Sequence, residues 1–161
     1  MAIRKLVSSE NEVLREKASV IKTITKPTIV LLDDMVETMF YYEGLGLAAP
    51  QLGIPRQGIV VNLGEGEALK LINPEILESD GEVVEVEGCL SLPGVLGEVA
   101  RAENILVEAL NEDNTTFKMN ASGLLARILQ HEIDHLKGIL FIDRAQRVVD
   151  PEEIEAKGEN I

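Results

Sequence analysis

The sequence contains little cysteine and no long apolar run. Its single cysteine cannot form a disulfide within the chain, so we expect a reducing, intracellular compartment. The longest apolar runs, such as 29–32 and 59–61, are far too short to cross a bilayer. The opening residues, MAIRKLVSSE, lack the apolar stretch of a secretory signal. We therefore expect a soluble, cytoplasmic protein with no membrane partner.

Basic residues are scarce as well. Fifteen lysines and arginines stand against 28 aspartates and glutamates, which gives a formal net charge of −13. This charge opposes stable binding to nucleic acid or to an anionic membrane. The chain of 161 residues is 45% hydrophobic and has no repeat or low-complexity tract. We therefore expect one globular domain that buries its own core.

Hydrophobic periodicity predicts two helices with strands between them. Pro27, which suits a first helical turn, and apolar residues at helical spacing predict a helix over 27–42. Glycines and a proline in 42–53 predict a loop, and a second helix is expected from about 120 to 138. Strand-like runs occupy 58–63, 68–73, 81–87, 95–100, 104–110 and 115–119. This order predicts an α+β fold, with mostly antiparallel strands packed around a central metal-binding helix (the second) and an N-terminal helix.

Both histidines of the chain lie in one short stretch of that second helix, QHEIDH at 130–135. At about 100° per residue, His131 and His135 lie one turn apart on one face, so both rings can reach a single ion. Glu132 lies beside that face, where its carboxylate can approach water on the metal. This geometry is typical of a metal hydrolase, in which the metal lowers the pKa of water and glutamate takes the proton. The alternative is a helix with an ordinary charged face.

A catalytic site of this kind needs a third protein ligand and an open position for water. The chain has no third histidine, whereas its 28 acidic residues leave a carboxylate open as the third ligand. Cys89, in EGCLSLPG at 87–94, is the thiolate candidate. Taken alone, a single free cysteine is more often a small buried hydrophobic residue. The residues by themselves therefore leave the third ligand undecided.

Three separated stretches together resemble the motifs of the peptide deformylase family. They are GLGLAAPQ (44–51), EGCLS (87–91) and QHEIDH (130–135), in the family's order and at similar intervals. LINPEI (71–76) and the segment 121–144 resemble the family too. The likeness covers most of residues 1–145.

The resemblance implies the metal ligands and a division of the chain. Cys89 would join His131 and His135 on the metal, and water would take the fourth position. A catalytic domain of residues 1–149 would precede an acidic tail, 150–161, in which five acidic residues and one lysine give a formal charge of −4. Because like charge repels RNA phosphate, we expect any transient association with the ribosome to use another surface.

Roles for the neighbouring residues follow from the same resemblance. Glu132 would be the general base and then the acid that protonates the leaving amine. The side-chain amide of Gln51 and the backbone N–H of Leu90 would donate hydrogen bonds to the oxyanion. Gly46 would pair with the substrate backbone. The methionine pocket would be lined by Leu45, Leu124 and Ile128.

The implied reaction is hydrolysis of the N-formyl group from the formyl-methionine that begins new polypeptides, with release of formate. Formyl-methionyl nascent peptides are thus the expected partners. A thiolate and two imidazoles leave a divalent ion with a net charge of +1, and they suit Fe(II), Zn(II), Ni(II) or Co(II). The residues alone favour zinc because zinc is the most frequent of these ions in protein sites. The resemblance instead implies Fe(II), which is sensitive to air beside a thiolate.

Two other classes of protein share the helix motif. A metallopeptidase of the HExxH type usually recruits a histidine or a carboxylate as its third ligand. A non-catalytic metal-binding protein needs a closed site, with Glu132 or another carboxylate as the fourth ligand. Metal exchange and the access of water would distinguish the second alternative from an enzyme.

Overall fold

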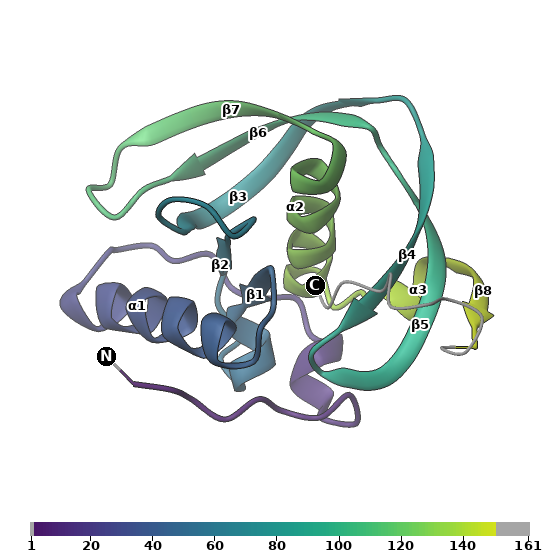
Figure 1. Cartoon of the computed structure of the whole chain (residues 1–161). Coiled ribbons are helices and arrows are strands. Elements are labelled where there is room, and N and C mark those ends of the chain that lie inside the picture. The colour runs from purple at the N-terminus through teal and green to yellow at the C-terminus, as the bar shows by residue number, and fades with distance from the viewer. Residues whose placement is uncertain (1, 151–161) are drawn as a thin grey trace.

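A central helix with antiparallel strands around it forms the frame of the molecule (Figure 1). The computed structural model describes residues 2–150. One sheet has five strands in the order β1 (Gly46–Ala48), β2 (Gly58–Val61), β3 (Leu69–Asp80), β6 (Asn104–Leu110) and β7 (Thr116–Ser122). The other has three, β4 (Val83–Cys89), β5 (Leu92–Arg101) and β8 (Ala145–Val149). Neighbouring strands in both sheets are antiparallel, so the predicted α+β class is confirmed.

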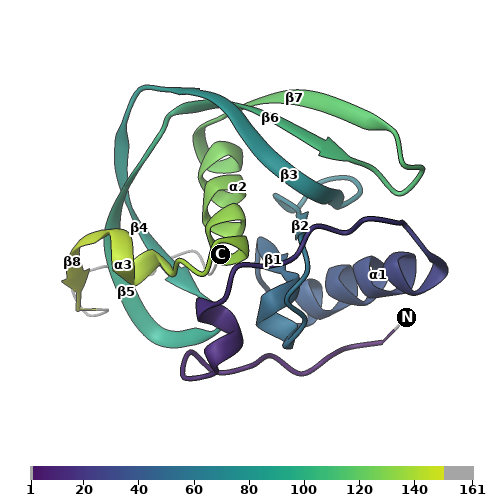
Figure 2. The ribbon, with the colours of Figure 1, turned by 180° about the vertical axis from the view of Figure 1, so that it is seen from behind.

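Helix α2 (Gly123–Leu136) lies in the middle of the strands in both the front and the back view (Figure 1, Figure 2). Its apolar side chains, Ile128, Leu129 and Ile133 among them, belong to one core cluster with residues of the five-stranded sheet. Burying each such side chain contributes about 1.5–3 kcal/mol. The helix ends before Gly138, whose φ of +76° favours glycine, and a Cβ there would lie 2.5 Å from the carbonyl oxygen of Arg15.

Helix α1 (Lys26–Tyr41) packs against β1 and β2, the strands that adjoin the first motif. Its first turn contains Pro27 and a capping box between Thr25 and Thr28. Buried apolar residues such as Leu32 and Met35 form its inner face. The predicted N-terminal helix is thus confirmed within one residue at each end.

Several short elements were not predicted. The segment 42–53, expected to be a loop, contains β1 and a 3-10 helix, η2 (Ala49–Leu52). Strand β3 continues to Asp80, past Pro74, with register shifts against β6 that accommodate a residue without an N–H. The remaining unpredicted elements are η1 (Glu12–Arg15), α3 (Phe141–Arg144) and β8. Four or five residues are too few for a hydrophobic period to be recognised, so tertiary contacts decide these elements.

No helix within residues 2–150 is both long enough and apolar enough to cross a membrane. Of the predicted acidic tail, 150–161, only Asp150 lies among the described residues. The division into a catalytic domain and a tail therefore stays a prediction.

Candidate metal centre and active site

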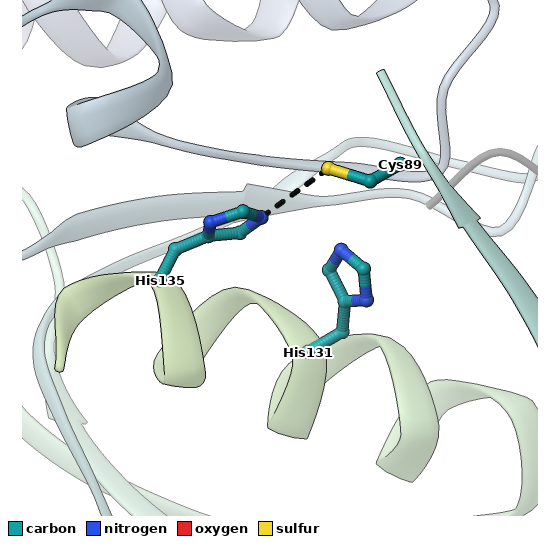
Figure 3. Close-up of side chains that lie close together, drawn as sticks. All are labelled: Cys89, His131 and His135. Carbon is teal, nitrogen blue, oxygen red and sulfur yellow. Dashed lines mark hydrogen bonds between the residues drawn. The ribbon is translucent and has the colours of Figure 1, made fainter. Parts of the chain in front are cut away.

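Helix α2 and the end of strand β4 bring together three side chains that could hold a metal ion (Figure 3). The ligand atoms of Cys89, His131 and His135 all lie within 4.8 Å of one another, and all three residues are buried. Cys89 Sγ lies 3.5 Å from His135 Nε2. The sulfur comes from a strand that is distant in sequence from the helix. The fold therefore places the second and third motifs at one point, as the sequence predicted.

The donor atoms fit a divalent metal ion. His131 Nδ1 lies 2.9 Å from Oε1 of the ionised Glu87, so this nitrogen donates its proton to the carboxylate and Nε2 is left as an acceptor. That Nε2 is buried and has no hydrogen-bond partner within residues 2–150. An unsatisfied buried group costs about 1–3 kcal/mol, a cost that ligation of a metal would remove. A thiolate and two neutral imidazoles are donors that a borderline or soft divalent ion prefers.

Burial controls the charges of the three ligands. Burial, reinforced by the negative charge of Glu132, raises the pKa of the Cys89 thiol to about 12. Burial also lowers the pKa of His131 and of His135, so both imidazoles are neutral and able to ligate. A divalent cation would stabilise the thiolate and reverse the shift at Cys89. The site therefore favours ionised sulfur only with a cation beside it.

Glu132 lies fully buried in the same site, and neither of its carboxylate oxygens has a partner within the described chain. Burial, with a contribution from the nearby Glu87 carboxylate, raises the pKa of Glu132 well above its ordinary value. Gly46 of β1 lies directly against it, because a Cβ at that glycine would lie 2.6 Å from Glu132 Oε2. A carboxylate that is free of hydrogen bonds and reluctant to ionise can accept a proton and return it.

Gln51, in helix η2, connects the first motif to the metal ligands. Its Oε1 accepts a hydrogen bond from the backbone N–H of Ala48 at 2.9 Å, so the amide nitrogen of the same side chain points away from Ala48. Nε2 donates to Ser91 Oγ at 3.2 Å and lies 3.6 Å from Cys89 Sγ. An amide donor is thus held beside the metal ligands.

Leu90 directly follows Cys89, which places its backbone N–H next to the sulfur-bearing residue. Its side chain lies against the first motif, since a Cβ at Gly44 would lie 2.7 Å from Leu90 Cδ1. The absence of a side chain at Gly44 therefore permits the first and second motifs to approach each other.

The predicted substrate-binding residues are grouped around Glu132, with one exception. Gly46 belongs to β1, which is one of the two edge strands of the five-stranded sheet and pairs with β2 on one side. Ile128 lies beside it, 2.9 Å from the position of a Cβ at Gly46, and Leu45 packs against the same core cluster as Ile128. Leu124 lies about two helical turns before Glu132 and is 44% exposed. It lies at the outer end of the helix rather than among the buried site residues.

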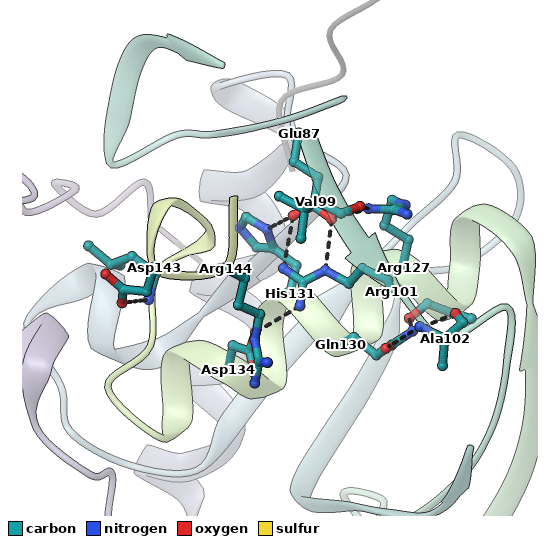
Figure 4. Close-up of polar contacts among 12 residues, drawn as sticks. Glu87, Val99, Arg101, Ala102, Arg127, Gln130, His131, Asp134, Asp143 and Arg144 are labelled. Atoms are coloured by element: carbon teal, nitrogen blue, oxygen red, sulfur yellow. Dashed lines mark hydrogen bonds and ion pairs between the residues drawn. The ribbon is translucent and has the colours of Figure 1, made fainter. Parts of the chain in front are cut away.

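A buried ionic network behind His131 was not predicted (Figure 4). Glu87 is fully buried and accepts hydrogen bonds from Arg101 (2.7 and 2.9 Å), Arg127 and His131. Arg101 also donates to Asp134 at 2.7 Å. Burial opposes ionisation of Glu87, but the hydrogen bonds from Arg101 and His131 outweigh it and hold the pKa of this carboxyl far below its usual range. His131, a candidate metal ligand, therefore faces an ionised acceptor.

One signal in the sequence could have identified Glu87. A histidine that binds a metal usually donates its other ring nitrogen to a carboxylate or a carbonyl group. Glu87 is the acidic residue of the motif that contains Cys89, so it is the natural candidate for that acceptor. Arg101 and Asp134 come from other elements, and no local pattern connects them to the site.

A buried Cys-His-His donor set, with an amide and a carboxylate that is unpaired within the described part of the chain beside it in an α+β frame, defines a metal-dependent hydrolase. The sequence model of the family described as Polypeptide deformylase matches residues 3–150. The chain belongs to that family.

Similar proteins agree over nearly the whole length. The chain is 48% identical to a peptide deformylase from Caldicellulosiruptor bescii, over 98% of this chain and 94% of that protein. It is 51% identical to a peptide deformylase from Carboxydothermus hydrogenoformans, over 92% of this chain and 97% of that protein. The crystal structure of the enzyme from Thermotoga maritima superposes with a TM-score of 0.88 at 37% identity, covering 91% of this chain and all of that one. The crystal structure of a peptide deformylase from Legionella pneumophila superposes with a TM-score of 0.86 at 40% identity, covering 94% of this chain and 89% of that one.

Membership of this family confirms that the chain is a metal-dependent hydrolase acting on N-formyl peptides. It favours the deformylase interpretation over a peptidase of the HExxH type. The interpretation as a non-catalytic metal-binding protein is wrong for the same reason.

Proposed function

We propose that Cys89, His131 and His135 hold a divalent ion at which formyl-methionyl peptides are deformylated. One observation carries this proposal: the three candidate ligand atoms lie within 4.8 Å of one another, buried, beside a carboxylate that has no hydrogen-bond partner among residues 2–150. When bound, the metal would polarise the formyl carbonyl and lower the pKa of water in the site. The protein residues then supply the proton transfers and the binding of the developing charge.

Glu132 acts as the general base. It takes a proton from the attacking water at one of its Oε atoms and later returns the proton to the leaving amine. Burial supports this role, because a carboxylate with a raised pKa releases its proton less readily to solvent and can deliver it to the amine. The missing side chain at Gly46 lets β1 lie directly against Glu132 without displacing its carboxylate.

Gln51 and Leu90 stabilise the oxyanion. The hydrogen bond from Ala48 to Oε1 of Gln51 keeps Nε2 directed at the ligand side of the site. The backbone N–H of Leu90 would be the second donor. Loss of one oxyanion donor typically lowers kcat by about 10²–10³-fold.

The substrate backbone pairs with β1 and its first side chain packs against α2. An edge strand can accept an extended peptide as a further strand, and Gly46 lies on that edge next to Glu132. Leu45, Ile128 and Leu124 would line the pocket for the methionine side chain. The exposure of Leu124 supports a position at the entrance of such a pocket.

Fe(II) is the ion we propose for the site, with Zn(II), Ni(II) and Co(II) as ions that the same donors would accept. A thiolate and two imidazoles suit each of them. The ion works as a Lewis acid without a change of oxidation state, so Ni(II) would support the same reaction in air while Fe(II) would lose it.

The natural partners in this proposal are formyl-methionyl nascent peptides in the cytoplasm. Transient contact with the ribosome would use a surface other than the acidic tail 150–161, which lies outside the described residues apart from Asp150. Neither a membrane nor stable nucleic-acid binding is part of the proposal.

Formate release tests the function. Protein purified without oxygen, with its metal quantified, is mixed with a formyl-Met peptide and with the same peptide carrying an N-acetyl group. We expect formate at one equivalent per peptide and little acetate. Release of free internal peptide fragments instead of formate would favour a peptidase and contradict the proposal.

A further inference from the structure

Helix α3 (Phe141–Arg144) reaches the metal ligand His131 from behind. Phe141 is 1% exposed, and its ring stacks on the His131 ring with centroids 6.1 Å apart and planes inclined by 22°. This separation lies within the range of attractive aromatic pairs. Gly97 of β5 permits the close packing, because a Cβ there would lie 3.3 Å from Phe141 Cε2.

The last residue of α3 is connected to Nδ1, at the edge of the same ring, by a chain of ion pairs and hydrogen bonds (Figure 4). Arg144 donates from Nε and Nη2 to the two oxygens of Asp134, at 2.6 and 3.0 Å. Asp134 also accepts a hydrogen bond from Arg101. Arg101 donates two further hydrogen bonds to Glu87, and Glu87 accepts a hydrogen bond from His131 Nδ1. The side chains between Arg144 and His131 are 0–7% exposed. The contacts therefore run without interruption from the half-exposed Arg144 to the ligand.

We infer that α3 is a positioning element for the metal ligand His131, through Phe141 on the face of the ring and through Arg144 on the ion-pair chain. The inference rests on the proposed metal-binding role of His131. Neither residue of α3 touches substrate or metal in this account. Both act by limiting how far the imidazole can turn away from the ion.

Removal of the Arg144 side chain tests whether the chain of ion pairs holds His131 in place. Arg101 is shared between Glu87 and Asp134. Without Arg144, the buried Asp134 would draw Arg101 toward itself, and Glu87 would be held less firmly against His131. Outer-shell partners of a metal ligand typically contribute 10–100-fold to metal affinity, and we expect about tenfold for this more distant residue.

A matched control is available on the neighbouring strand. Arg147 of β8 is also a half-exposed arginine, and it pairs with Glu98 at 2.6 Å, away from the chain that leads to His131. An exposed pair of this kind contributes little to stability. The variants Arg144→Ala and Arg147→Ala therefore remove the same side chain a few residues apart, and only the first interrupts the chain.

The experiment follows Co(II) in the loaded protein. The rate of Co(II) transfer to excess chelator and the visible absorption of bound Co(II) are measured for wild type and both variants. We expect Arg144→Ala to release Co(II) about tenfold faster with an altered spectrum, and Arg147→Ala to match wild type. Equal release rates and spectra for the two variants would overturn the inference. Wild-type protein that binds no Co(II) would overturn the proposed metal site itself, which is a different result.

Two further measurements guard against a general loss of folding. A cavity of about 290 Å³ is lined by Arg144, Asp134, Arg101 and Lys137, so a small guanidinium compound can reach the place of the missing side chain. Millimolar methylguanidinium should restore slow Co(II) release in Arg144→Ala and leave Arg147→Ala unchanged. Phe141→Leu should independently speed release and alter the spectrum. Failure of both the rescue and the Phe141 effect would contradict a positioning role for α3.

Discussion

Replacing Gly46 by alanine tests the arrangement of β1 against the general base. The added Cβ would lie 2.6 Å from Glu132 Oε2 and 2.9 Å from both Glu132 Cγ and Ile128 Cγ2. Three contacts below 3.0 Å cannot be relieved by one small movement, so the Glu132 side chain or strand β1 must shift. Overpacking of this kind typically costs about 1–3 kcal/mol of stability.

Gly46→Ala should lower the rate of catalysis as well as the stability. A displacement of about 1 Å at a reacting group can cost about 10²-fold in rate. We therefore expect kcat/KM for a formyl-Met peptide to fall by about that factor, while the metal content stays at the wild-type value because none of the three ligands is touched.

Gly58→Ala is the matched control. This glycine lies on the adjacent strand β2, and its added Cβ would meet only ordinary contacts, the nearest being Leu32 Cδ2 at 3.4 Å. It should keep nearly full activity. Wild-type kcat/KM in Gly46→Ala, or an equal loss in both variants, would refute the reasoning that a side chain at position 46 displaces Glu132.

Three further predictions address the metal, the oxyanion and acid stability. Cys89→Asp should retain a divalent ion and lose most deformylation, because the metal–oxygen bond of roughly 2.0–2.2 Å is shorter than the bond of about 2.3 Å to sulfur. Cys89→Ala should lose the metal. Full metal content in Cys89→Ala, measured by atomic absorption, would contradict the three-ligand site. Gln51→Ala should lower kcat by about 10²–10³-fold with little change in metal content, and a change confined to KM would contradict an oxyanion role. Burial raises the pKa of Asp34, but hydrogen bonds from Arg4 and from the Ala2 N–H outweigh it and leave the pKa below its ordinary value. The stability that this ionised carboxyl supplies is present above about pH 4 and is lost as the pH falls through the lower, folded-state pKa. Asp34→Asn should therefore be less stable than wild type at neutral pH and should lose less stability on acidification, as measured by urea titrations. Parallel stability–pH profiles for the two proteins would contradict this prediction.

The two helices and the grouping of the candidate metal ligands could be predicted because their signals are local or repeated. Two histidines at i and i+4 define a face without any tertiary information, and α1 carries both a cap and a hydrophobic period. Cys89 was a different case, because a lone cysteine has no local signature of ligation. Only its place in the second of three motifs distinguished it from a buried hydrophobic residue.

The parts that were missed depend on contacts between distant elements. Helix α3 has four residues, and it is held by packing of Phe141 and by the pairing of Arg144 with Asp134. The same holds for β1, which forms only because β2 pairs with it. The network around Glu87 joins residues of β4, β5 and α2, and no period or spacing in the sequence announces such a set.

The central claim is that Glu132 transfers protons at a metal held by Cys89, His131 and His135. Glu132→Gln tests it most directly, because the amide keeps the size of the side chain but cannot act as a base, and all three ligands remain. Metal content and the rate of formate release are measured on the same anaerobic preparation. We predict full metal content with a rate reduced by about 10²–10⁴-fold. An active variant, or one that has lost its metal, would contradict the account.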